Sequence, residues 1–192
     1  DMVAFPWQVF GCAGQTEFQD RPVTQQFIQC EASPEDGGNP IRDIKTIFRR
    51  PLEIDRFGLH RPRFYDNDGH GFVWRMPNGT DVSDEMNTTP KARSEWDMAR
   101  TAAYMNHYPI RAVESYLVKK LRGRANHFKD DLGEDYFRRW NLNDKEDRSI
   151  ARFDTARQDA EAALRTDKKI VELHDEGVTQ MRTRIAKLME QS

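Results

Sequence analysis

The sequence has few cysteines and no long apolar run. Its two cysteines, Cys12 and Cys30, are too few for a disulfide framework and lack the spacing of metal ligands. No apolar stretch approaches the roughly 20 residues of a membrane-spanning helix, and no signal-peptide pattern opens the chain. These absences predict a cytoplasmic protein with reduced thiols and no transmembrane segment. A location at the inner face of the membrane is also compatible with them.

Neither sign of charge dominates the chain. Thirty basic and 32 acidic side chains give a formal net charge of -2. This balance argues against a general polyanion-binding protein, although it is compatible with local basic patches. We therefore expect no nucleic-acid partner. Hydrophobic residues make up 37% of the sequence, so the core is expected to be concentrated in parts of the chain.

The sequence patterns of several well-defined sites are also missing. There is no glycine-rich phosphate loop, nucleophile elbow or dinucleotide fingerprint. No HxH, HExxH or CxxC pattern supports a complete metal site. The segment Asp66-Asn67-Asp68-Gly69 resembles the start of a calcium loop, but no glutamate follows at the EF-hand distance. These observations exclude a calcium loop.

The first half of the sequence has the composition of strands and loops. The apolar run 2–10 predicts a buried strand followed by a glycine-bearing turn at 11–14. Because this strand begins almost at the first residue, we expect the sequence to start inside a fold. Residues 23–29 suggest a short strand or helix, and 45–49 suggest another strand. Glycine, proline, asparagine and aspartate are frequent over 56–90, which favours turns and short extended pieces.

The second half has the composition of helices. Residues 96–108 are ambiguous between helix and strand, and Pro109 makes a break after them. Apolar side chains then recur at helical spacing, which predicts an amphipathic helix over 111–122, ended by Gly123. Residues 144–192 contain no proline and predict two helices that break near Thr166-Asp167, where Asp167 can cap the second.

The second of these C-terminal helices carries an apolar stripe. Its members are spaced by three and four residues and are Val171, His174, Val178, Met181, Ile185 and Leu188. A narrow stripe of this kind suits a helical hairpin or a helix partner. We therefore expect a helical hairpin that is also a candidate surface for homo-oligomer formation.

Two histidines and one basic cluster are candidates for ligand binding. His60 and His107 lie in extended segments that could present an imidazole to a ligand or metal; the alternative is a hydrogen-bonded structural histidine. The cluster consists of Lys119, Lys120, Arg122 and Arg124 and could hold a phosphate or diphosphate. Its alternative role is a solvated helix end whose charges suit the helix dipole.

Acidic residues in the loop-rich middle could hold a hydroxyl, a sugar or a cation. They are Asp66, Asp68, Asp81, Asp84 and Glu85. The alternative is that they are solvated loop residues, as most such side chains are. Trp7 and Phe10 could stack on a sugar ring, but aromatic side chains on a buried strand more often belong to the core.

Several segments, taken in order over about residues 2–150, resemble the C-terminal part of bacterial family-2-like glycosyltransferases, related to the family-92 group. They are Trp7-Gln8-Val9-Phe10-Gly11-Cys12-Ala13-Gly14, Val23-Thr24-Gln25-Gln26-Phe27, Lys45-Thr46-Ile47-Phe48-Arg49, His60-Arg61-Pro62-Arg63-Phe64, Asn106-His107-Tyr108, Ser115-Tyr116, Lys119-Lys120, Arg122-Gly123 and Glu146-Asp147-Arg148-Ser149. The resemblance implies an α/β fold, with residues 1–143 as the acceptor-side half of a GT-A-like sandwich and 144–192 as a helical extension.

The resemblance also implies an activity and its ligands. Such enzymes transfer a sugar from a nucleotide-sugar donor to a glycan or surface polysaccharide acceptor, with Mn²⁺ or Mg²⁺ on the donor diphosphate. The donor half carries an Asp-x-Asp motif that these 192 residues lack at the corresponding place. This chain is therefore expected to contribute acceptor binding and part of the metal and diphosphate site, and to be inactive alone.

The resemblance assigns roles to individual residues. His107 is the expected metal ligand, and the substrate-binding residues are His60, Arg63, Trp7, Lys119, Lys120 and Arg122. A family-2-like inverting mechanism needs a carboxylate general base; Asp20 is the first candidate, with Glu17 and Asp66 behind it. Two alternatives to an enzyme stay open, a non-enzymatic helical interaction module built on 150–192 and an anion-binding regulator that uses Lys119–Arg124.

Overall fold

The computed structural model describes residues 1–49, 54–63, 72–88, 93–95, 102–122 and 132–190. It has a mixed α/β fold with a sheet and several helices, as the sequence predicts at the level of fold class. The chain forms two compact units, of which the first comprises Asp1–Gln8 and Ala32–His107 and the second comprises Val9–Glu31 and Tyr108–Ser192. The boundary expected at 143/144 lies inside the second unit.

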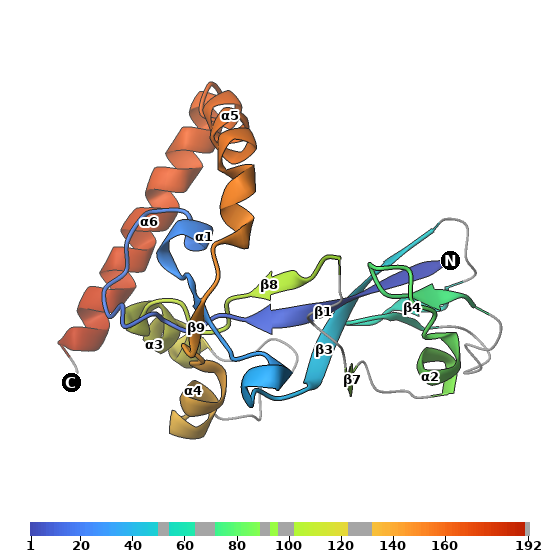
Figure 1. The fold of residues 1–192 in the computed structure, drawn as a ribbon. Helices are drawn as coiled ribbons and strands as arrows, with labels where there is room; N and C mark the ends of the chain where they lie inside the picture. The colour runs from blue at the N-terminus through green and yellow to red at the C-terminus, as the bar shows by residue number, and fades with distance from the viewer. Residues whose placement is uncertain (50–53, 64–71, 89–92, 96–101, 123–131, 191–192) are drawn as a thin grey trace. The chain divides into compact units, whose positions relative to one another are not determined.

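The first unit is built on a sheet around strand β1 (Met2–Val9). Strand β3 (Ile41–Phe48) runs antiparallel to β1, with Ala4 opposite Thr46, and β6 (Trp74–Arg75) runs parallel to β1. Strand β7 (Arg93–Glu95) pairs with β3, and β8 (Met105–His107) pairs with β1. The ribbon shows β1 and β3 as the long strands of this sheet (Figure 1). The buried strand predicted over 2–10 is thus confirmed.

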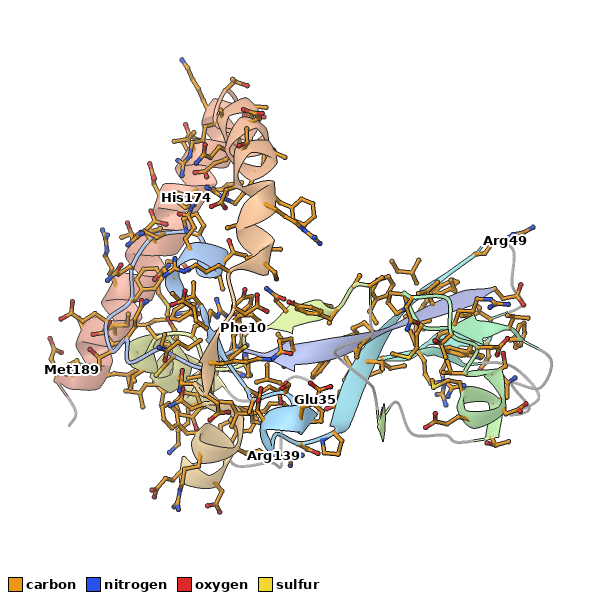
Figure 2. All side chains as sticks on the ribbon, viewed as in Figure 1. Phe10, Glu35, Arg49, Arg139, His174 and Met189 are labelled. Atoms are coloured by element: carbon orange, nitrogen blue, oxygen red, sulfur yellow. The ribbon has the colours of Figure 1, made fainter. Side chains whose placement is uncertain are left out.

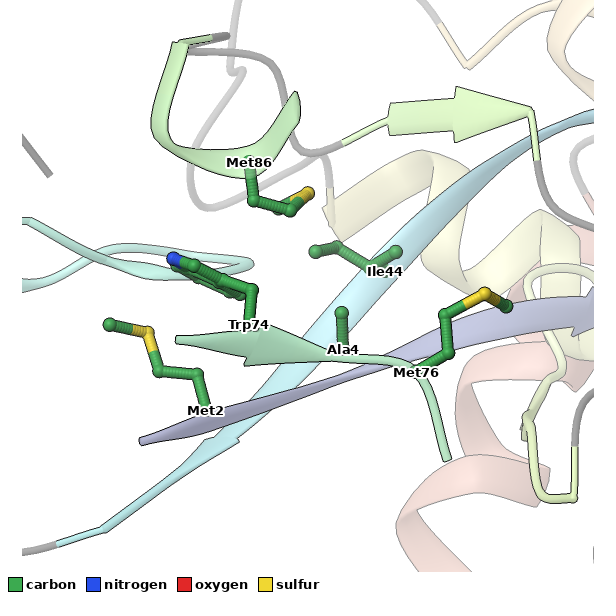
Figure 3. Packing of buried hydrophobic residues seen from close by; sticks show 6 residues of the cluster. All are labelled: Met2, Ala4, Ile44, Trp74, Met76 and Met86. Atoms are coloured by element: carbon green, nitrogen blue, oxygen red, sulfur yellow. The ribbon is translucent and has the colours of Figure 1, made fainter. Parts of the chain in front are cut away.

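Alternate side chains of β1 build the core of the first unit. Met2 and Ala4 are buried, as the two-residue period of a strand requires for neighbours that point to one face. They pack in one apolar cluster with Ile44, Trp74, Met76 and Met86 (Figure 3). Burial of large apolar side chains such as Trp74 stabilises a fold by about 2–3 kcal/mol each.

Short elements complete the first unit. They are the 3-10 helix η1 (Pro34–Asp36), strands β4 (Arg56–Phe57) and β5 (Pro62–Arg63), and helix α2 (Ser83–Thr88). β4 and β5 pair antiparallel as a small separate sheet. Within 56–90, the short elements β4, β5 and α2 agree with the turns and brief pieces that the composition of this range predicts.

The second unit combines short N-terminal elements with helices from later in the chain. Helix α1 (Val23–Gln26) leads into β2 (Gln29–Cys30), which pairs antiparallel with β9 (Lys145–Glu146). Helices α3 (Val113–Arg122) and α4 (Glu134–Trp140) follow the proline break. Cys12, Ile110 and Tyr116 form a buried cluster in this unit, against which Leu117, Tyr136, Phe137 and Trp140 pack.

The C-terminal segment forms 3-10 helix η2 (Ser149–Phe153) and helices α5 (Asp154–Leu164) and α6 (Lys168–Met189). The predicted break is confirmed, because Asp167 caps α6 by accepting a 2.8 Å hydrogen bond from the Lys169 N–H. Within the second unit α6 packs against α3, and all six residues of the apolar stripe are half-buried. Within the described ranges, no helix combines the length and apolar composition that crossing a bilayer requires.

Helix α5 has no buried residue. Its side chains form a line of ion pairs in which Arg157 contacts Asp154 at 3.3 Å and Glu161 at 2.9 Å. Glu161 also accepts from Arg165 at 2.9 Å, and Arg165 lies one residue beyond the helix. Pairs spaced by three and four residues contribute only a few tenths of a kcal/mol each to an exposed helix. The ion pairs therefore give only modest support to a helix that has no fully buried side chain.

A turn at Gly11–Gly14 follows β1 and is held by two asparagines. The Cys12 N–H donates to Asn141 Oδ1 at 2.7 Å, and the Ala13 N–H donates to Asn143 Oδ1 at 2.8 Å. A Cβ atom at Gly11 would overlap the side-chain amide of Asn143. Glycine at this position is thus required by the close approach of the asparagine.

Gly11→Ala should lower the free energy of unfolding by about 1–3 kcal/mol, the usual cost of forcing an extra methyl group into a packed site. Urea denaturation of both proteins measures this difference. The same substitution made in an Asn143→Ala background should cost clearly less, because the overlapping amide is gone. Equal costs in the two backgrounds would show that the amide is not what excludes a side chain at Gly11.

Candidate functional site

The indole of Trp7 is the centre of a polar and aromatic cluster in the first unit. The His107 ring stacks on it with a centroid separation of 3.9 Å and an interplanar angle of 26°. The His60 ring lies 5.2 Å from it at 38°, and Lys45 Nζ lies 5.6 Å from the ring centroid. Two imidazoles and an ammonium group thus surround one indole.

Strand pairing explains why these distant residues meet. Trp7 lies on β1, and His107 lies on β8, which pairs with β1. Lys45 lies on β3, the antiparallel neighbour of β1. The backbone before β5 is fixed to β3, because Thr46 Oγ1 donates to the His60 carbonyl at 3.0 Å and Lys45 Nζ donates to the Leu59 carbonyl. The sheet therefore brings His60 to the same indole.

The hydrogen bonds of His60 select one tautomer of its ring. Nδ1 lies 2.9 Å from the Ile44 carbonyl oxygen, and a carbonyl can only accept, so Nδ1 carries the proton. In the neutral ring Nε2 then has a free lone pair, which is the arrangement that metal-binding or proton-accepting histidines use. Among the described residues, no hydrogen-bond donor to Nε2 is found.

Trp7 itself is deeply buried, with 7% of its surface exposed. Its Nε1–H has no hydrogen-bond acceptor in the part of the chain that the structure describes. An unpaired buried donor is costly and calls for a specific cause. Burial also lowers the pKa of the nearby Lys45 ammonium from its ordinary value, while the charge of Asp43 opposes this shift.

The cluster offers only part of a metal site. Among the residues that the structure describes, no three histidine, cysteine, aspartate or glutamate side chains are placed to hold one ion. His60 and His107 are the imidazoles available at Trp7, and imidazole suits borderline divalent cations better than Mg²⁺. A cation bound at these histidines would therefore need further oxygen ligands, such as those of a diphosphate.

The predicted diphosphate-binding residues lie on α3 in the second unit. Lys119 Nζ donates to the Pro109 carbonyl at 2.8 Å and to Tyr136 Oη at 2.9 Å, which occupies two of its three N–H groups. Lys120 and Arg122 are exposed. Lys119 and Lys120 are consecutive residues of α3, and one residue step turns the side-chain direction by about 100°. The two ammonium groups therefore do not point to one ligand.

The predicted general base Asp20 lies in the second unit and contacts helix α6. Its Oδ2 is 3.1 Å from Nε2 of His174, and His174 lies on α6 (Figure 2). Glu17 is exposed. Asp66 and Asp68 lie outside the described residues, and Arg63 belongs to β5, although its side chain is likewise not described.

The other acidic candidates have local structural roles. Asp81 Oδ1 accepts from both the Ser83 N–H at 2.9 Å and the Ser83 hydroxyl at 2.5 Å. These bonds hold the pKa of the Asp81 carboxyl below its ordinary value. Asp84 and Glu85 lie in the first turn of α2, where negative charge is favoured by the helix dipole.

Sequence reasoning missed three groups that the structure makes prominent. Lys45 was expected only as part of a strand, and the clamp of Asn141 and Asn143 on the glycine turn was not anticipated. Glu31 is 4% exposed, and its carboxylate accepts a 2.8 Å hydrogen bond from the Val9 N–H. Glu31 directly follows the short strand β2. Its position could have marked it as a buried carboxylate that needs a hydrogen-bond donor, because buried charge requires partners.

Asp81→Asn tests the pKa shift of this carboxyl. A carboxyl with a lowered pKa in the folded chain stabilises the fold above its unfolded pKa, and this contribution disappears as pH falls through the folded pKa. The asparagine keeps an oxygen acceptor for Ser83 but does not titrate. The difference in Tm between wild type and Asp81→Asn should be constant from pH 7 to about 5 and should shrink below about pH 4. A difference that stays constant down to pH 2 would contradict the shift.

The chain was compared with protein-family models, with curated proteins and with solved structures. None of the three comparisons found a match.

Proposed function

We propose that this chain is the acceptor-side part of a metal-dependent, GT-A-like glycosyltransferase. The observation that carries the proposal is the cluster at Trp7. Its four side chains come from four of the sequence segments that resemble such enzymes. Trp7 and His107, which are farthest apart in the sequence, are in direct ring contact. Convergence of separate segments on one place supports a common ligand site better than any one segment does.

Each residue of the cluster has a role in the proposed reaction. His107 and His60 would hold the divalent cation, which supplies positive charge to the leaving diphosphate. Trp7 supports the His107 ring by stacking. Its Nε1–H, which has no acceptor among the described residues, would donate to an oxygen of the bound sugar or phosphate. The Lys45 ammonium adds positive charge at the same place. The donor is a nucleotide-sugar, the acceptor a glycan, and the expected location cytoplasmic.

Asp20 remains the proposed general base for the acceptor hydroxyl. A base must be held in position as well as be ionised, and the 3.1 Å contact with His174 would fix the orientation of its carboxylate. Asp66 is the second candidate for this role. The donor-binding half with its Asp-x-Asp carboxylates would come from outside these 192 residues.

A second candidate function is a helical assembly module. It is favoured by large apolar side chains exposed at the ends of the C-terminal helices, such as Leu164 (56% exposed) on α5 and Met189 (61% exposed) on α6. Exposed apolar surface of this kind is typical of interaction sites. The proposed partner is a second copy of the chain.

Replacement of His107 tests the enzyme proposal in the complete gene product. His107→Ala should lower the rate of nucleoside diphosphate release from nucleotide-sugars, assayed with Mn²⁺ and a panel of donors and glycans, by about a hundredfold. This corresponds to about 3 kcal/mol of lost charge stabilisation in the transition state. Mn²⁺ affinity, measured by calorimetry, should fall in parallel.

His107→Phe is the matched variant for this experiment. Phenylalanine keeps an aromatic ring on Trp7 but has no nitrogen ligand, so it separates packing from metal binding. We expect His107→Phe to be as impaired as His107→Ala. Full activity and full Mn²⁺ affinity in His107→Phe would remove the ligand role of this residue.

The assembly candidate is tested by charge substitution on the exposed apolar residues. Leu164→Lys and Met189→Lys should each shift sedimentation toward the monomer, because burying a lysine in a helix–helix contact is unfavourable. Lys187→Ala on α6 is the control and should leave the sedimentation profile unchanged. Identical profiles for all four proteins, wild type included, would contradict assembly through these helices.

A further inference from the structure

A pocket of about 400 Å³ lies between α3 and α6 in the second unit. Helix α3 contributes residues spaced by three and four, helix α6 contributes a longer row, and Phe18 and Arg111 come from loops. The remaining lining residues are Ser115, Val118, Lys119, Arg122, Leu173, His174, Gly177, Val178, Met181 and Arg184. The volume falls in the range of about 300–1,000 Å³ that is usual for small-molecule sites.

The charged side chains that line this pocket are basic, although the carboxylate of Asp20 contacts the lining residue His174. Among its described lining residues none is acidic, whereas Arg111, Arg122 and Arg184 all contribute guanidinium groups. None of the three arginines forms a hydrogen bond or ion pair with a residue that the structure describes. Arginine binds phosphate through paired N–H donors more effectively than lysine does. The pocket is therefore suited to an anion that carries more than one oxygen acceptor.

The rest of the lining is apolar. Phe18, Val118, Leu173, Val178 and Met181 face the same pocket. An inorganic ion would leave these side chains unused, while a purely apolar ligand would leave the guanidinium groups without partners. The combination indicates a ligand with an anionic group at one end and an apolar group at the other.

Two backbone features at the pocket are unfavourable in the absence of a ligand. Gly177 lies in the middle of α6, where glycine is a poor helix former. An added Cβ would lie more than 4 Å from the surrounding atoms that the structure describes. Arg111 has a φ of 62°, a left-handed conformation that is costly for a residue with a side chain. The open space at Gly177 and the place of Arg111 in the pocket lining are both consistent with a ligand site.

We propose that the pocket between α3 and α6 binds a phosphate ester whose organic part is apolar. The guanidinium groups of Arg111, Arg122 and Arg184 hold the phosphate oxygens, and the apolar side chains cover the organic part. This site goes beyond the proposed sugar transfer and does not depend on it. All of its lining residues belong to the second unit, and ligand binding can be measured there without an assay of sugar transfer. It also gives Arg122 a phosphate partner that is independent of a donor diphosphate.

Calorimetric titration with octyl phosphate below its micelle concentration tests the site. Octyl phosphate should bind at least about tenfold more tightly than inorganic phosphate or octanol, because only it supplies both groups. Equal affinity for octyl phosphate and inorganic phosphate would overturn the proposal. So would the absence of binding by octyl phosphate.

Three variants separate binding from folding. Arg111→Gly removes a guanidinium group and also relieves the backbone conformation, so phosphate affinity should fall about tenfold while Tm holds or rises. Gly177→Leu should fill the pocket and abolish binding without unfolding α6. Arg182→Ala, on α6 but outside the pocket, is the charge-matched control and should bind normally. Normal binding by Gly177→Leu, or equal losses in Arg111→Gly and Arg182→Ala, would refute the site.

Vesicles identify the source of the phosphate. If phosphatidylcholine vesicles containing phosphatidic acid cosediment with wild type but not with Gly177→Leu, the ligand is a bilayer lipid. If the two proteins cosediment equally, or neither does, the ligand supported by the octyl phosphate titration is a soluble ester. Vesicles of phosphatidylcholine alone should bind neither protein.

Discussion

The first unit depends on strand β1, whose backbone is hydrogen-bonded to strands from three later parts of the chain. A strand placed inside a sheet must satisfy its polar backbone on both sides, and it can do so only when those later segments have been folded beside it. The same pairing determines which side chains meet. Met2 and Ala4 reach the apolar core, while Trp7 receives the rings of His60 and His107.

Periodic local patterns made part of this fold predictable. The apolar run of β1, the helical spacing of α3 and the Asp167 cap of α6 are written in consecutive residues, and each was found where the sequence placed it. The stripe on α6 was also predicted correctly as its half-buried face. Local hydrogen bonding and burial decide such features, so they need no knowledge of the rest of the chain.

The arrangement of the site could not be predicted in the same way. His60 and His107 were chosen one by one from their surroundings in the sequence, but their common contact with Trp7 arises from strand pairing across large sequence separations. The 3.1 Å contact of Asp20 with His174 likewise joins residues far apart in the chain. Nothing in the local sequence indicates that Lys119 would be bound by Pro109 and Tyr136.

Helix α5 is supported by ion pairs between its own side chains, whereas the two units are stabilised by buried apolar clusters. None of its residues is fully buried, and the paired side chains are half-buried, with 27–47% of their surface exposed. Added salt therefore still weakens the attractions between them. Raising ionic strength should therefore loosen α5 while the apolar cores of both units are left intact or strengthened. Proteases would then cut first at α5, so the salt concentration chosen for purification decides how long the C-terminal helix stays attached.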